Sequence, residues 1–279
     1  KNGTIVVDPS VKPSTAVFWM FKNQTLTFDN VKIVATGVTG TYLIGLDGDN
    51  SDLNLLNGSE IVVENTTALD LDIICVNAST GNDIKVENSK VNVTNLDGRV
   101  FFRGNYTVKD SEVNLAGITK AGFRIEAGQT LSIEGTSKVK ITGEPRDGGI
   151  HLTDVTAKYT KAETATVNAT VNRPAIAKIG DTPYYTFAEA AAAAQADSEI
   201  KLLANIEGDI TVPANVTLNG NGFAISGAIT ADGTITFAGV TKAGNFSVKN
   251  VNTVVNIPAG ASLQLTGSGR MVIGHGCTF

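Results

Sequence analysis

The sequence predicts an all-β protein that winds as a right-handed parallel β-helix, with three short strands in each coil. Two observations support this fold class: a strand–corner–strand unit recurs at a nearly constant spacing, and a third short apolar stretch separates successive units. The composition agrees, since glycine accounts for 29 of 279 residues and aromatic residues for only 6%. Such solenoids need small residues at their corners and stacked aliphatic side chains in a narrow core.

In the recurring unit, apolar and polar residues alternate, a corner of Asn, Asp, Gly or Ser follows, and the alternation resumes. Alternation with a period of two predicts strands with one buried face, and the corner residues tolerate turn dihedral angles. The unit starts are separated by 27, 31, 22 and 25 residues. The units are Leu26–Val34, Leu53–Val63, Ile84–Val93, Tyr106–Leu115 and Leu131–Ile141.

A third strand is expected between successive units. The apolar stretches that predict it are Tyr42–Leu46, Leu71–Val76, Val100–Phe102 and Phe123–Ile125. A sandwich of hairpins remains an alternative, because Asn57-Gly58 and Asp97-Gly98 are typical hairpin turns. The steady repeat favours the β-helix, in which each coil pairs with its neighbours about 4.8 Å away.

Two modules are expected, a β-helix over residues 1–172 and a second β-helix over residues 173–279, either separate or continuous. Residues 157–171 are rich in Ala and Thr and are predicted to form a terminal strand or a connection. Thr186 and Glu189 have the spacing of a capping box before an alanine run, which predicts one short capping helix near residues 187–196. After this helix the alternating pattern resumes at 200–203, 210–212, 216–218, 223–225, 234–237, 246–248, 254–257 and 263–265.

The start of the second module resembles a known family. Ala177–Ala190, followed by Ile200–Leu203 and Ile210–Gly220, is similar to the opening of pectate-lyase-like β-helix modules of bacterial cell-surface and putative adhesion proteins. The resemblance covers about 45 residues, and the rest of the chain matches in pattern alone. It implies a short helix that shields the end of the solenoid, together with export and a surface location. It implies no catalytic residues, because this fold carries lyases, hydrolases, tail spikes and adhesins alike.

Charge and hydropathy exclude two classes of partner. The net charge is −5, the pI is near 5.1 and no Lys/Arg cluster is present, so no nucleic-acid partner is expected. No apolar run approaches the roughly 18 residues of a membrane-spanning helix, so no transmembrane segment is expected in this chain. We expect that an export signal and an outer-membrane anchor lie outside this sequence.

The motifs that suggest an enzyme are incomplete. Gly274-His275-Gly276 is similar to a tripeptide of polygalacturonase-type hydrolases, but the adjacent Asp-Asp pair of those enzymes is missing, so a glycine-flanked turn is predicted. His151 is expected to be structural or exposed. The arginines are dispersed along the sequence, at Arg99, Arg103, Arg124, Arg146, Arg173 and Arg270. No catalytic residue and no cofactor is predicted, although carboxylates of neighbouring coils could still meet at the spacing that hydrolysis needs.

One acidic loop could bind calcium. Asp47, Asp49 and Asp52 offer oxygen ligands, but the later bidentate Glu of a calcium loop is missing unless Glu60 or Glu64 folds back. A solvated corner loop is the favoured interpretation, and a calcium site remains open.

Cysteine, asparagine and aromatic residues complete the candidates. Cys75 is expected to be buried and unreactive, with a disulfide to Cys277 as the less favoured alternative. The apolar segment Val17–Phe21 is expected either to be buried under an N-terminal cap or to use Trp19 in contact with a sugar or a protein. Ten Asn-x-Ser/Thr sequons indicate a polar outer ladder: Asn2, Asn23, Asn57, Asn65, Asn77, Asn92, Asn105, Asn168, Asn215 and Asn245.

Taken together, the sequence predicts a secreted or surface-displayed bacterial protein that acts as a non-catalytic adhesion or binding scaffold. Its partner would be a polysaccharide or a host or bacterial surface protein, bound through a polar solenoid face. The alternatives are a polysaccharide lyase or glycoside hydrolase on the same fold, and a passive structural stalk.

Overall fold

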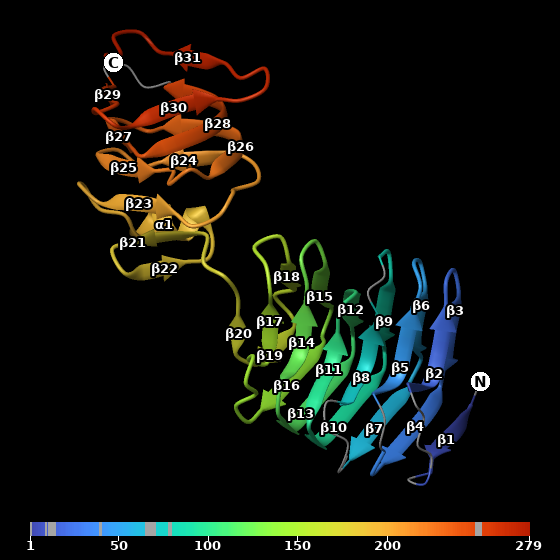
Figure 1. The fold of residues 1–279 in the computed structure, drawn as a ribbon. Helices are drawn as coiled ribbons and strands as arrows, with labels where there is room; N and C mark the ends of the chain where they lie inside the picture. Colours follow the sequence, from blue (N-terminus) through green and yellow to red (C-terminus); the bar gives the residue numbers. More distant parts are fainter. Residues whose placement is uncertain are drawn as a thin grey trace. The chain divides into compact units, whose positions relative to one another are not determined.

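A computed structural model describes residues 2–8, 10, 15–38, 41–64, 71–77, 80–248 and 253–279. The chain divides into two compact units, Lys1–Arg173 and Pro174–Phe279, and each is a stack of β-coils (Figure 1). The predicted fold class is confirmed: the protein is a parallel β-solenoid, and its described residues include one short helix. Among the described residues, no helix has the length and apolar character needed to cross a membrane.

The first unit consists of three parallel sheets, and each complete coil contributes one strand to each sheet (Figure 1). Sheet 1 contains, in spatial order, β1 (Gly3–Val7), β4 (Val31–Thr36), β7 (Glu60–Glu64), β10 (Lys90–Leu96), β13 (Glu112–Ile118), β16 (Lys138–Thr142) and β19 (Thr166–Asn168). Sheet 2 contains β2 (Ala16–Phe21), β5 (Tyr42–Asp47), β8 (Leu71–Val76), β11 (Gly98–Phe102), β14 (Ala121–Ile125), β17 (Ile150–Leu152) and β20 (Val171–Asn172). Sheet 3 contains β3 (Thr25–Asp29), β6 (Asp52–Leu56), β9 (Asp83–Glu87), β12 (Asn105–Lys109), β15 (Thr130–Glu134) and β18 (Lys158–Lys161).

The core of the first unit is a set of aliphatic ladders, because strands pair in register from coil to coil. In β10 and β13, Val91 lies opposite Val113 and Val93 lies opposite Leu115, and all four side chains are buried. The predicted strand–corner–strand units and the intervening third strands are confirmed throughout this unit. Alternation alone decides which side chains face the core.

The terminal segment of the first unit differs from the prediction. Residues 157–171 were expected to form a single strand or a connection, but they supply β18, β19 and the start of β20, which extend all three sheets by one more coil. Tyr159 and Val167 still point toward the core, although they are only partly buried at the end of the stack. Short strands rich in Thr and Ala carry too weak an alternation to reveal such a coil from sequence.

The second unit opens with the only antiparallel pairs among the described strands: β21 (Ala177–Ile179) pairs with β22 (Thr182–Tyr184) and with β23 (Glu199–Leu202). Helix α1 (Phe187–Ala193) follows β22, and its predicted capping box is present, with the Glu189 N–H donating to Thr186 Oγ1 at 3.1 Å. The helix ends at Ala193 instead of 196, because Ala194 has an extended backbone and the Gln195 N–H donates to Ser198 Oγ.

The coils of the second unit are built from a straight sheet and a bent one. After β21–β23, the straight sheet continues with β25 (Val216–Asn219), β27 (Ile235–Ala238) and β29 (Val255–Asn256). The bent sheet contains β24 (Ile210–Val212), β26 (Ala224–Ala231), β28 (Val240–Val248), β30 (Ser262–Leu265) and β31 (Met271–Ile273). The register of β26 against β28 shifts between Ile225 and Ala228. The long strand β26 bends at this point, and its two halves form parts of two faces of the coil. Gly227 lies at this bend, where a Cβ atom would overlap the backbone of Gly208.

The aromatic segment at the start of the chain is split between core and surface. Phe18 packs edge-to-face against Phe28 at 5.5 Å between ring centroids, and Met20 is buried. Trp19 faces the other way and stacks on Tyr42 of the next coil at 6.1 Å. Phe21 is 59% exposed. The N-terminal cap expected over this segment would fall partly on residues 11–14, which lie outside the described residues.

Buried serines stabilise the corners between sheet 3 and sheet 1. Ser59, Ser89, Ser111 and Ser137 occupy equivalent corners of successive coils. The Ser137 hydroxyl accepts a hydrogen bond from the N–H of Ser111 at 3.2 Å and lies 2.7 Å from the carbonyl oxygen of Glu134. These bonds satisfy backbone groups that the turn removes from the β-ladders.

Replacing Ser137 with alanine should therefore lower the free energy of unfolding by about 1–3 kcal/mol, because a buried N–H loses its acceptor. Denaturant-induced unfolding measures the loss. Ser132→Ala is the matched control, because the Ser132 hydroxyl donates to the Glu134 side chain on the surface; a change within about 0.5 kcal/mol is expected there. Equal losses in the two variants would contradict a structural role for the corner serines.

Candidate functional site

The outer face of sheet 2 brings aromatic, basic and acidic side chains from successive coils into two rows. In one row Tyr42, Asp72 and Arg99 are register partners. The second row follows the next outward position and contains Trp19, Gly45, Cys75, Phe102, Arg124 and His151. Both rows run along the coil stack, so residues far apart in sequence become neighbours on one surface.

Three arginines converge on one aromatic ring in these rows. The guanidinium carbons of Arg99, Arg103 and Arg124 lie 3.9, 4.6 and 5.7 Å from the centroid of Phe102. Phe102 is consequently only 9% exposed. We call these four residues the arginine cluster. The sequence interpretation of dispersed arginines was wrong for these three, because coil winding places positions 99 and 124 on adjacent strands.

Arg99 is held by a buried carboxylate. Its Nε and Nη2 atoms donate to the two oxygens of Asp72 at 2.8 and 3.2 Å. The Asp72 side chain is only 2% exposed, and burial raises its pKa in spite of the neighbouring Arg99. This bidentate pair fixes the plane of the Arg99 guanidinium against Phe102.

Arg124 also has a carboxylate partner, at the surface. Its Nε atom donates to Glu126 at 2.9 Å, and the Thr153 hydroxyl donates to the other oxygen of Glu126 at 2.9 Å. Partial burial alone would raise the pKa of Glu126, but these hydrogen bonds and the positive charges of Arg124 and Arg103 lower it. Glu126 is therefore ionised at neutral pH.

Arg103 has no such partner. Among the described residues its side chain makes no ion pair or hydrogen bond, and its contact is the face of Phe102. Its φ angle is 61°, in the left-handed region, and it is the one residue there in the described chain that is not Gly, Asn or Asp. This conformation costs a side chain of its type about 1–2 kcal/mol. Strained residues of this kind gather at functional sites.

A small notch lies beside Arg103. The corner between β11 and β12 consists of Arg103 and Gly104 alone, whereas residues 126–129 make a longer corner in the next coil. Corner residues of three successive coils, 80–82, 104–105 and 127–129, line a cavity of about 170 Å³. Glycines and polar side chains line it, among them Thr80, Asn105 and Gln129.

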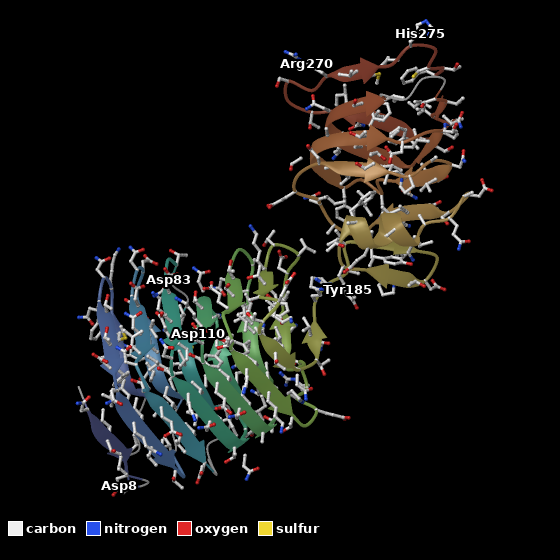
Figure 2. The ribbon with its side chains drawn as sticks, turned by 180° about the vertical axis from the view of Figure 1, so that it is seen from behind. Asp8, Asp83, Asp110, Tyr185, Arg270 and His275 are labelled. Carbon is white, nitrogen blue, oxygen red and sulfur yellow. The ribbon has the colours of Figure 1, made fainter. Side chains whose placement is uncertain are left out.

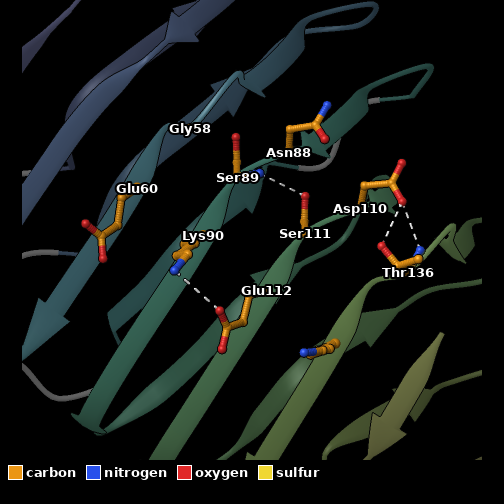
Figure 3. Close-up of a pocket in the computed structure, with 10 residues that line it drawn as sticks. Gly58, Glu60, Asn88, Ser89, Lys90, Asp110, Ser111, Glu112 and Thr136 are labelled. Carbon is orange, nitrogen blue, oxygen red and sulfur yellow. Dashed lines mark hydrogen bonds and ion pairs between the residues drawn. The ribbon is translucent and has the colours of Figure 1, made fainter.

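A larger groove of about 590 Å³ lies at the corner between sheets 3 and 1 (Figure 3). Its side chains already satisfy one another: Lys90 pairs with Glu112 at 3.5 Å, and Asp110 accepts hydrogen bonds from the N–H and hydroxyl of Thr136 at 2.9 and 3.2 Å. Lys138 at its rim makes no ion pair with any described residue. The groove is therefore the weaker candidate for a ligand site.

The acidic loop expected to be solvated ties coils together. Each of its three carboxylates accepts a hydrogen bond from the following coil: Asp47 from Asn77 at 3.1 Å, Asp49 from the Thr80 N–H at 2.9 Å, and Asp52 from the Asp83 N–H at 3.2 Å. Glu60 instead pairs with Lys32 at 2.9 Å. Within the described ranges, no group of three His, Cys, Asp or Glu side chains could hold a metal ion.

The two histidines occupy different environments. His275 lies in a turn with Gly276 at a φ of 74°, as predicted, and points outward from the last coil of the second unit (Figure 2). His151 lies in the outer row of sheet 2. Partial burial lowers its pKa, and Arg124 lowers it further, against the opposing charges of Asp147 and Glu126. These neighbours could not be predicted from sequence, because they come from other strands and corners.

Cys75 and several of the described sequon asparagines have structural surroundings. Cys75 and Cys277 are not joined by a disulfide, and burial raises the pKa of Cys75 to about 12, so its thiol is protonated at neutral pH. Several sequon asparagines join adjacent coils: Asn92 accepts from Asn114 at 3.0 Å, and Asn57 donates to Asp29 at 3.0 Å. This agrees with the expected polar outer ladder. Asn65 lies outside the described residues.

In comparisons with known proteins, no family model matches the sequence, and no match was found among curated proteins or among solved structures. The function therefore has to be argued from the arginine cluster and its surroundings.

Proposed function

We propose that the protein is a non-catalytic binding scaffold, exported and displayed at the cell surface, that recognises polysaccharide on the outer face of sheet 2. The arginine cluster is the observation that carries this proposal. It offers planar, hydrogen-bonding guanidinium groups, and the Trp19–Tyr42 stack lies on the same face. Planar cations and aromatic rings in a row suit an extended ligand with many polar groups. The resemblance to surface β-helix modules supports the same proposal.

Binding without cleavage is favoured because neither of the two carboxylates that pair with the arginine cluster, Asp72 and Glu126, is free for proton transfer. Asp72 is buried and engaged by both donors of Arg99. Glu126 accepts from Arg124 and Thr153, and its lowered pKa makes it a poor general acid. Inverting hydrolysis needs one carboxylic acid and one free carboxylate across the sugar, and Asp72 and Glu126 do not supply such a pair.

The test is retardation of the protein in native gels that contain polysaccharides, with neutral and acidic polymers in parallel. We expect retardation by at least one polymer, without new reducing ends and without unsaturated uronates. Release of either product would support the lyase or hydrolase alternative. A chain that binds no polysaccharide, or binds protein alone, would contradict the proposal and leave the stalk or a protein-binding scaffold.

A further inference from the structure

We propose that Arg103 is the anion-recognising residue of this surface, so that the ligand is an acidic polysaccharide whose carboxylate or sulfate oxygens lie on the Arg103 guanidinium. This inference rests on the proposed function and narrows it to one ligand chemistry. It predicts which polymers bind and which single side chain decides between them.

The first step is the balance of charge in the arginine cluster. Arg99 is paired with Asp72 and Arg124 with Glu126, whereas the charge of Arg103 has no ion-pair partner among the described residues. All three guanidinium groups lie within 5.7 Å of the same ring centroid. The three guanidinium groups and the carboxylates of Asp72 and Glu126 together carry a net charge of +1, which a bound anion would neutralise.

The second step is the backbone conformation of Arg103. The other positive-φ positions in the described chain carry Gly, Asn or Asp, which reach this region at low cost. The Arg103 N–H is bound to the carbonyl oxygen of Arg124 at 3.0 Å, and Gly104 follows at a φ of 93°. The corner is thus fixed, and the side chain is aimed along Phe102. An arginine in this strained position is explained by a role in binding, since Gly or Asn would serve the fold better.

The third step is the surface around Arg103. The neighbouring cavity of about 170 Å³ includes Gly104 but not Arg103, and its polar side chains are already bonded within the fold: the Thr80 hydroxyl donates to Asp49 and the Asn105 amide to Asp83, both at 3.1 Å. Recognition of the anion therefore has to come from the Arg103 guanidinium itself. The net charge of −5 gives no general attraction for polyanions, so binding has to come from this local site.

The experiment compares three polymers: neutral dextran, dextran sulfate with the same backbone, and alginate as a carboxylate polymer. The intact chain should bind dextran sulfate or alginate and not dextran. Arg103→Gly should raise the Kd for the acidic polymer about tenfold or more, the loss of one charge-assisted contact. Lys138→Ala is the matched control, since it removes one unpaired positive charge from the other groove; a change within about twofold is expected.

Arg103→Gly keeps the fold, because glycine adopts a positive φ without strain, and Arg103→Asn gives a second variant with the same property.

If dextran binds as tightly as the acidic polymers and Arg103→Gly has no effect, this inference is overturned and the proposed function remains intact. An equal loss in Lys138→Ala would also overturn it, since the attraction would be general. Failure to bind any of the three polymers overturns it as well, and the wider polysaccharide panel then decides the proposed function by itself. Tighter binding of alginate would indicate recognition of carboxylates, and tighter binding of dextran sulfate would indicate recognition of sulfates.

Discussion

Replacing Gly98 with alanine is expected to destabilise the first unit by about 3 kcal/mol or more. Gly98 is the first residue of β11 and lies opposite Leu71 in the register of sheet 2. A Cβ atom at Gly98 would overlap the carbonyl oxygen of Leu71 and lie 2.7 Å from its carbonyl carbon. These are backbone atoms of the adjacent coil, so no side chain can rotate away to make room.

Relief of this overlap would require the two coils to separate. The Leu71 N–H donates to the carbonyl oxygen of Asp97 at 3.0 Å, and the Lys120 N–H donates to that of Gly98 at 3.1 Å, so separation breaks ladder hydrogen bonds on both sides. Chemical denaturation of the intact chain measures the loss.

The matched control is Gly3→Ala in β1, where a Cβ atom would have no neighbour within 4 Å; a change within about 0.5 kcal/mol is expected. Similar stabilities of the two variants would show that sheet 2 is not packed as closely as described.

The fold could be predicted from sequence because its signal is local. Val91 and Val93 face the core simply because they are two residues apart on a strand, and Asn88 and Ser89 mark the corner before them. The same rule failed at the end of the first unit, where short strands such as β19 leave little alternation to read. It also misplaced the end of α1, because alanine propensity continues past Ala193 while the Ser198 hydroxyl bonds the Gln195 N–H and stops the helix.

The arginine cluster could not be predicted from sequence in the same way, because it depends on register between coils. Asp72, Arg99 and Arg124 are spaced by 27 and 25 residues, within the range of the repeat. Coil lengths vary from 22 to 31 residues, so spacing alone does not show which side chains share a row. The strain at Arg103 left no signal either, since an arginine before a glycine is unremarkable until its φ angle is known.

Replacing Arg99 with methionine is expected to lower stability by about 3–5 kcal/mol at neutral pH, more than replacing its partner Asp72 with asparagine. The losses of stability differ because Asp72 is more deeply buried than Arg99. Without Arg99, the Asp72 carboxylate, now 2% exposed, loses both of its guanidinium hydrogen-bond donors and, of the two cations beside it, keeps only the electrostatic attraction of Arg103. Without the carboxylate, Arg99 is 15% exposed and still lies on the Phe102 ring, so a loss of about 2 kcal/mol is expected.

The loss in Arg99→Met should shrink as the pH falls. Burial already raises the pKa of Asp72 above its unfolded value of about 3.9, and removal of Arg99 raises it further. The folded variant therefore takes up a proton at higher pH than the unfolded chain, so its stability rises relative to the parent as pH falls through the folded pKa. Unfolding free energies of both proteins at about pH 7 and pH 5 test this, and a loss that does not depend on pH would contradict it.

The double variant Asp72→Leu with Arg99→Met separates the cost of an isolated charge from the value of the pair. If the large loss in Arg99→Met comes from a buried carboxylate without a partner, removing that carboxylate as well should restore most of the stability. The main role of the Asp72–Arg99 pair would then be to position Arg99 on Phe102, beside Arg103, and its contribution to the stability of the fold would be small. A double variant as unstable as Arg99→Met would instead show that packing of the Arg99 side chain, and not its charge, stabilises this part of sheet 2.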